Sequence, residues 1–126
     1  MKQVIHTTNA PKAIGPYSQA IKAGETLYIS GQVPMNPETG QIVAGGISEQ
    51  TEQVMQNIAA ILKEADYSFN DVVKSTCLLS DMSNFASMNE VYGKYYPQNP
   101  PARAAFAVKE LPLGVLVEIE TIAVKH

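Results

Sequence analysis

The clearest periodic pattern in the chain lies between Ser48 and Ala65. Its apolar residues recur at three- and four-residue spacings, at Val54, Met55, Ile58, Ile61, Leu62 and Ala65. Most of the charged and amide side chains of this segment lie off that stripe, as expected for an amphipathic helix. Because Gly45 and Gly46 interrupt the preceding segment, we predict that Ser48 caps the start of the helix.

A shorter helical pattern follows Ser80-Asp81. Its apolar stripe consists of Phe85, Met88, Tyr92 and Tyr95. Ser83 or Asn84 is the predicted N-cap. Pro97, Pro100 and Pro101 prevent the helix from continuing, because proline lacks the backbone N–H that an interior turn requires.

The remaining apolar segments predict strands. Ser18–Ala23 and Thr26–Ile29 flank a Gly24-Glu25 turn, which indicates a hairpin, and the run from Pro34 to Gly40 breaks any further strand. Val72–Leu79, Ala102–Val108 and Leu116–Val124 are rich in β-branched and small apolar residues. The order of elements predicts one α+β domain over residues 1–126, with two helices on one face of a single sheet.

The last strand suggests that this sheet is covered on both sides. Val115, Val117, Ile119, Thr121 and Ala123 share one face, and Leu116, Glu118, Glu120, Ile122 and Val124 share the other. Neither face is wholly polar, and two helices can cover only one of them. We therefore expect the second face to meet another subunit.

Composition narrows the possible functions. Nine basic and twelve acidic residues give a net charge of −3 without a dense basic cluster, which disfavours nucleic acid as a partner. No apolar run is long enough for a signal peptide or a membrane span, so we expect a cytoplasmic protein that does not contact a membrane. A single cysteine, Cys77, and two histidines, His6 and His126, predict neither a disulfide nor a metal site.

The residues that stand out chemically are in the last third of the chain. Arg103 follows Pro100-Pro101-Ala102 at the entry to a strand, and Glu118 and Glu120 lie inside the neighbouring strand. An arginine fork there can hold a carboxylate, and a partly buried glutamate can exchange protons or orient water. The alternative is a structural Arg–Glu ion pair in a subunit interface.

Several segments resemble the Rid (YjgF) family, and together they cover essentially the whole chain. The longest is the run from Pro101 to Pro112, PARAAFAVKELP, followed by VEIE from Val117 to Glu120. The other segments are GPYSQA at 15–20, YISGQ at 28–32, DMSNF at 81–85 and Asn89.

This resemblance implies a chorismate-mutase-like (YjgF) α+β fold with a single mixed sheet, assembled as a homotrimer with active sites between subunits. It implies hydrolysis of 2-aminoacrylate, 2-aminocrotonate and their imine tautomers, 2-iminopropanoate and 2-iminobutanoate, to 2-keto acid and ammonia, without a cofactor. Arg103 would hold the substrate carboxylate, and Glu118 would protonate or orient the attacking water. The pocket would be lined by Tyr17, Ser30, Gly31 and Asn89, and by the backbone of Ala105.

Two points stay open at this stage. Many members similar to RidA carry cysteine where this chain has Ala105, so any role that requires a thiol there is absent. A non-catalytic module that binds a 2-keto acid such as 2-ketobutyrate would use the same residues. Ribonuclease activity, ascribed to some relatives, is disfavoured by the acidic net charge.

Overall fold

The computed structural model describes residues 1–126 as a six-stranded sheet with two α-helices. The strands are β1 (Gln3–Ile5), β2 (Ala20–Ala23), β3 (Thr26–Gln32), β4 (Val72–Leu79), β5 (Ala102–Ala107) and β6 (Val117–Val124). Their order across the sheet is β1-β2-β3-β6-β4-β5, and only β4 and β5 pair in parallel. The predicted mixed sheet is thus confirmed, whereas β1 was not predicted.

The β2–β3 hairpin forms where the sequence predicts it. Gly24 has a φ of +61°, a left-handed conformation that glycine adopts without steric cost, so the chain can reverse tightly between the two strands. The core-facing residues Leu27 and Ile29 of β3 are buried. β2 begins at Ala20 rather than Ser18.

Helix α1 (Ile47–Glu64) buries the predicted apolar stripe, with Val54, Met55 and Ile58 fully inaccessible to solvent. The predicted cap was wrong, because Gly46 and not Ser48 is the N-cap residue. Glu49 explains the earlier start: its carboxylate accepts a hydrogen bond of 2.8 Å from the Gly46 N–H, which satisfies a donor that the helix itself leaves free.

Helix α2 (Phe85–Gly93) follows a 3₁₀ turn, η2 (Met82–Asn84), and has Asn84 as its N-cap residue. The Asp81 carboxylate accepts a 2.8 Å hydrogen bond from the Ser83 N–H and so starts the turn. The helix and the proline-rich segment after it carry the chain from β4 to β5, the long crossover that a parallel pair requires.

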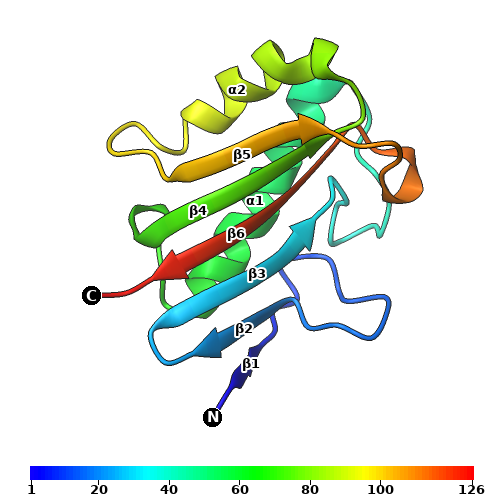
Figure 1. Ribbon diagram of the computed structural model, residues 1–126. Coiled ribbons are helices and arrows are strands. Elements are labelled where there is room, and N and C mark those ends of the chain that lie inside the picture. The colour runs from blue at the N-terminus through cyan, green and yellow to red at the C-terminus, as the bar shows by residue number, and fades with distance from the viewer.

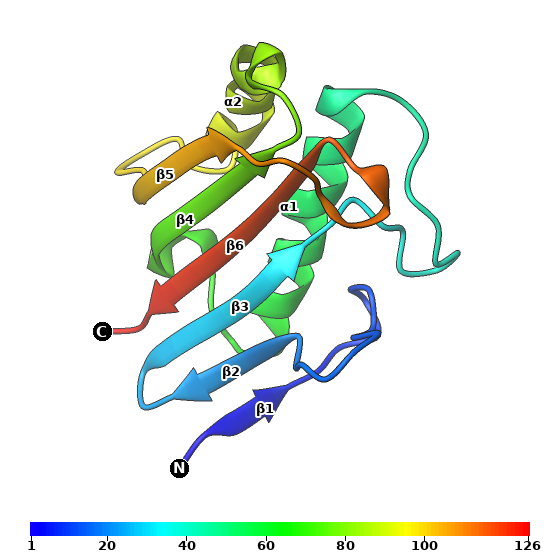
Figure 2. The ribbon, with the colours of Figure 1, turned by 45° about the vertical axis from the view of Figure 1, so that its right-hand side comes forward.

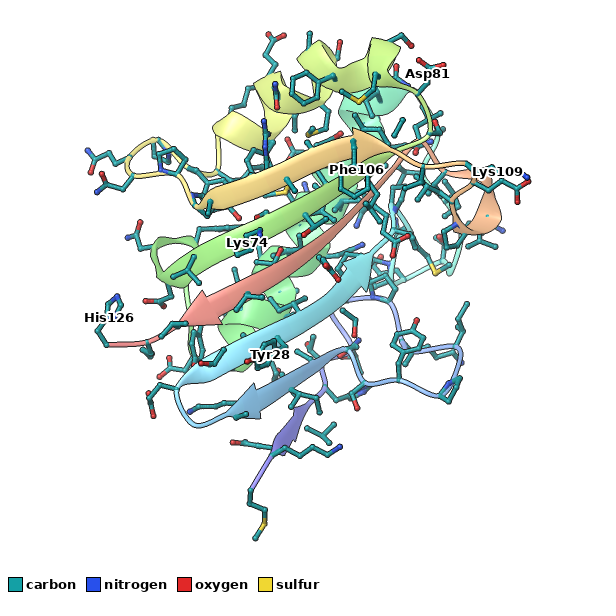
Figure 3. The ribbon with its side chains drawn as sticks, in the orientation of Figure 1. Tyr28, Lys74, Asp81, Phe106, Lys109 and His126 are labelled. Carbon is teal, nitrogen blue, oxygen red and sulfur yellow. The ribbon has the colours of Figure 1, made fainter.

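Both helices lie on the same side of the sheet, as predicted (Figures 1 and 2). We call this side the helix face and the other the open face. In β6 the burial alternates strictly, with Val117, Ile119 and Ala123 fully buried on the helix face. On the open face, the side chains of Tyr28 and Phe106 are 50% and 48% exposed (Figure 3).

Two further short 3₁₀ turns complete the chain, η1 (Phe69–Asp71) before β4 and η3 (Pro112–Gly114) before β6. Leu113 in η3 has a φ of +59°, and Gly114 after it has a φ of +66°. Neither helix is long and apolar enough to cross a membrane.

Candidate functional site

A cavity of about 520 Å³ opens beside the carboxylates of β6. It is lined by Pro11, Lys12, Ile14, Tyr17, Ser30, Gly31, Val33, Met35, Pro112, Leu113, Glu118 and Glu120. The walls are mainly apolar, and the two carboxylates supply the acidic groups. Four of the predicted site residues, Tyr17, Ser30, Gly31 and Glu118, therefore meet here.

A bulge in β3 brings Ser30 and Gly31 to this cavity. The pairing between β3 and β6 shifts register between Ile29 and Gln32, so that Ile29 and Gln32 are both buried. Such a bulge places an extra residue on one strand and redirects side chains. The Ser30 hydroxyl donates a 2.6 Å hydrogen bond to the Ser18 carbonyl, which holds the bulge against the preceding segment.

The Glu118 side chain lies against Gly31, which leaves room for it because glycine has no side chain. A Cβ at residue 31 would overlap the Glu118 carboxylate oxygen and would stand 3.0 Å from the carboxyl carbon. No side chain larger than hydrogen fits without moving Glu118.

The environment of Glu118 favours its protonated form. Partial burial raises the pKa of the Glu118 carboxyl, and the negative charge of Glu120, two residues further on the same face, raises this pKa further. A carboxyl group of this kind can hold a proton and release it to a nearby acceptor.

The wall opposite β6 is a loop held by one buried side chain. Gln19, which is 3% exposed, donates from its amide nitrogen to the carbonyls of Thr7 (3.0 Å), Ala10 (3.3 Å) and Pro11 (2.8 Å). Its amide oxygen accepts from the Thr7 N–H at 2.7 Å. These bonds fix the path of the segment that carries Tyr17, a residue that is 50% exposed.

Arg103 lies elsewhere, against helix α2. Its Nη1 donates a 2.6 Å hydrogen bond to the Asn89 side-chain oxygen. The central guanidinium carbon lies 5.5 Å from the centre of the Phe85 ring and 5.1 Å from that of Tyr92. The chain's one salt bridge joins Lys125 and Asp66, so Arg103 forms no ion pair within the chain.

The register shows that Arg103 and Glu118 project from opposite faces of the sheet. Arg103 pairs with Ser75 of β4, which is buried on the helix face, whereas Glu118 pairs with Leu78 on the open face. The strand of Arg103 is also not a neighbour of β6, because β4 lies between them. The expected adjacency of these two strands was wrong, and a single subunit does not bring the two residues together.

Comparison with known proteins identifies relatives of this chain over nearly its full length. A family model described as Endoribonuclease L-PSP matches residues 7–125. A RutC family protein of Pyrococcus horikoshii is 60% identical over the full length of both chains. The 2-iminobutanoate/2-iminopropanoate deaminase of Mus musculus is 52% identical over 99% of this chain and 93% of its own. The crystal structure of RidA from a Psychrobacter species superimposes with a TM-score of 0.94 at 49% identity, covering 98% and 99% of the two chains.

The chain belongs to the Rid (YjgF) family.

In this Rid protein, Ala105 packs partly buried against the core on the helix face, two residues after Arg103. It pairs with Cys77, the one cysteine, which is fully buried. Burial raises the pKa of the Cys77 thiol to about 11, although the nearby charge of Arg103 acts in the opposite direction. The thiol is therefore protonated near neutral pH, which agrees with the packing role predicted for it.

The structure adds residues to the candidate site for which the sequence analysis predicted no role in it. Lys12, Ile14, Met35 and Leu113 line the cavity from loops distant in sequence, and Phe85 and Tyr92 flank the Arg103 guanidinium. The spacing of Phe85, Asn89 and Tyr92 was a usable signal, because residues four and seven positions apart share one face of a helix. No comparable signal exists for the loops.

Proposed function

We propose that this Rid protein hydrolyses 2-aminoacrylate, 2-aminocrotonate and their imine tautomers, 2-iminopropanoate and 2-iminobutanoate. Water adds to the imine carbon, the carbon–nitrogen bond breaks, and the products are a 2-keto acid and ammonia. The mouse relative is named for this activity, and the identity between the two chains extends over nearly their full lengths.

Arg103 is proposed to hold the substrate carboxylate. Its guanidinium carries a charge that no acidic side chain of the chain neutralises, and Asn89 is a neutral partner that occupies one side of it. The remaining N–H groups can form two parallel hydrogen bonds to a carboxylate. An anion with a planar carboxylate therefore fits this position.

Glu118 is proposed to move the proton. Partial burial and the charge of Glu120 raise the pKa of Glu118, which favours proton exchange, so its carboxyl group can protonate the substrate or take a proton from the attacking water. An imine conjugated to a carboxylate is already electrophilic, so that positioning together with one proton relay can supply much of the acceleration. Tyr17, Ser30 and Gly31 line the same cavity.

The observation that carries this proposal is that Arg103 and Glu118 lie on opposite faces of the sheet within one chain, so that the site is divided into two halves. We define the arginine half as Arg103, Asn89, Phe85 and Tyr92, and the glutamate half as Glu118, Gly31, Ser30 and Tyr17. A substrate that contacts both halves must lie between two subunits. We therefore propose a homotrimer in which each site takes its arginine half from one subunit and its glutamate half from the next.

The open face favours such an assembly. Tyr28 and Phe106 expose about half of their side chains on it, and Leu78, Ile122 and Val124 are only partly covered. Closed cyclic assemblies bury surfaces of this kind between identical subunits. Light scattering should report a trimer at micromolar concentration, and a stable monomer would contradict both the assembly and the shared site.

A coupled assay tests the reaction. A serine or threonine dehydratase generates the enamine in the cuvette, and the decay of its absorbance is followed with and without the protein. We expect the protein to accelerate that decay. If the decay matches buffer while 2-ketobutyrate still binds, the protein is a binding module rather than an enzyme.

Subunit exchange tests the shared site. Arg103→Ala and Glu118→Gln homotrimers are each expected to be inactive, but after random exchange about one quarter of the sites should regain both intact halves. Activity near one quarter of the wild-type level should therefore return. A mixture of wild type with the Arg103→Ala/Glu118→Gln double variant is the control for exchange, and no recovery would place both halves of each site within one subunit.

A further inference from the structure

Arg103 is exposed to solvent, yet its guanidinium lies against three side chains of α2. The side chain of such an arginine on an edge strand is ordinarily free to sample many rotamers, and ordering it costs conformational entropy. Here the guanidinium lies against Phe85, Asn89 and Tyr92, which share one face of α2. We call the surface formed by these three residues the slot.

The two aromatic rings differ from Asn89 in what they contribute. Asn89 accepts one hydrogen bond and so fixes one nitrogen of the guanidinium. Phe85 and Tyr92 attract the cation through their ring faces and constrain where its plane can lie, while using none of its N–H donors. The rings thus restrict the orientation of the fork and leave its donors for another partner.

Aromatic packing supports the Tyr92 side of the slot. Tyr92 is 5% exposed, and its ring lies 4.8 Å from that of Tyr96 in a tilted arrangement. The Tyr96 ring in turn meets Phe69 of η1 edge-on at 5.4 Å. Beside Arg103, its register partner Ser75 of β4 is fully buried. The aromatic packing around Tyr92 therefore holds one of the two rings that contact Arg103 in place.

We infer that Phe85 and Tyr92 are positioning residues for Arg103, which orient its guanidinium to receive the carboxylate of a 2-imino or 2-keto acid. This inference rests on the proposed function of Arg103 and deepens it. The bland alternative is that the rings only join α2 to the edge strand. In that case their loss would lower stability without any specific dependence on Arg103.

A double-mutant cycle separates the two explanations. The probe is 2-ketobutyrate, which carries the carboxylate but lacks the nitrogen to be hydrolysed, and its binding is measured by calorimetry. Phe85→Leu removes the ring at the partly exposed end of the slot, and Phe85→Tyr is the matched control that keeps it. We expect Phe85→Leu to weaken binding roughly threefold to thirtyfold and Phe85→Tyr to bind like the wild type.

The Arg103→Ala background makes the test specific. Without the guanidinium the ring has nothing to orient, so Phe85→Leu should then change the dissociation constant by less than about twofold. An equal loss in both backgrounds, or no loss in either, would overturn the inference. Tyr92→Phe, which keeps the ring in the core, should retain binding, and thermal unfolding checks that each variant is folded.

The binding readout also keeps this inference separate from the proposed reaction. A wild-type protein that binds the keto acid with the expected coupling but does not accelerate enamine decay would refute the deaminase and leave the positioning role intact. A wild-type protein that turns over enamine but shows no coupling between Phe85 and Arg103 would refute the positioning role and leave the deaminase intact. Failure of the wild type to bind 2-ketobutyrate at any attainable concentration would overturn the positioning role.

Discussion

The two halves of the site are built in different ways. The arginine half lies on regular elements, with Arg103 on an edge strand and its neighbours on one face of α2. The glutamate half lies where strands become irregular, at the β3 bulge and beside loops held by Gln19. The arginine half thus has a frame of regular elements, and the glutamate half has walls made largely of loops. The comparison suggests that the first half fixes the orientation of the ligand and the second controls proton transfer, and the following experiments test that division.

The largest expected loss of kcat comes from a substitution in the glutamate half. Glu118→Gln keeps the shape of the side chain but abolishes proton exchange, so kcat should fall about 10²–10⁴-fold while binding of 2-ketobutyrate stays largely intact. Steady-state kinetics on the coupled assay measures it. Glu120→Gln is the matched control and should retain most of the rate. The opposite result would transfer the proton relay to Glu120.

Unlike Glu118→Gln, Arg103→Ala should weaken ligand binding, because it removes the proposed partner of the substrate carboxylate. We expect a loss of roughly 2–5 kcal/mol in kcat/KM, accompanied by weaker binding of 2-ketobutyrate. Arg103→Lys should restore only part of this loss, since it keeps the charge but lacks the planar fork. A lysine variant with full activity would mean that charge alone is sufficient.

Gly31→Ala tests the close approach between the bulge and Glu118. The new methyl group must displace the carboxylate, and a shift of this size should cost about tenfold to a hundredfold in kcat. Gly93→Ala is the control, because a Cβ there meets no atom within 4 Å. If Gly31→Ala were as active as wild type, the position of Glu118 would not be critical.

A smaller effect should appear in the pH profile. Burial and the charge of Glu120 both raise the pKa of Glu118. In a plot of kcat against pH, the transition that reports Glu118 should therefore occur at higher pH than it would for a solvent-exposed glutamate. Glu120→Gln removes one of the two causes, so this transition should move to lower pH. A transition that stays in place would mean that another group controls it.

The smallest effect is expected at Cys77. The thiol is buried beneath the arginine half and protonated, so Cys77→Ser should leave turnover within about tenfold of wild type. Activity and thermal unfolding should be measured together. A larger loss of activity at unchanged stability would show that the thiol influences Arg103.

Much of the fold was readable from local pattern. The stripe from Val54 to Leu62 identified α1, the turn at Gly24 identified the β2–β3 hairpin, and the alternation in β6 placed Glu118 and Glu120 away from the core. These features depend on the period of the backbone, which a linear sequence displays directly. The short strand β1 carries no such period and was missed, and the Gly46 cap depended on the hydrogen bond that the Gly46 N–H donates to the Glu49 carboxylate.

The sequence by itself identified the family and the candidate site residues, since the segments around Tyr17, Gly31, Arg103 and Glu118 are those that resemble the Rid family. Only the tertiary structure decided how these residues are arranged. Strand β4 lies between the strand of Arg103 and the strand of Glu118. Arg103 is in register with Ser75 of β4 and Glu118 with Leu78, and these two β4 residues point to opposite faces of the sheet. Arg103 and Glu118 therefore also point to opposite faces. Strand order and register arise from long-range pairing, which no local pattern of residues encodes.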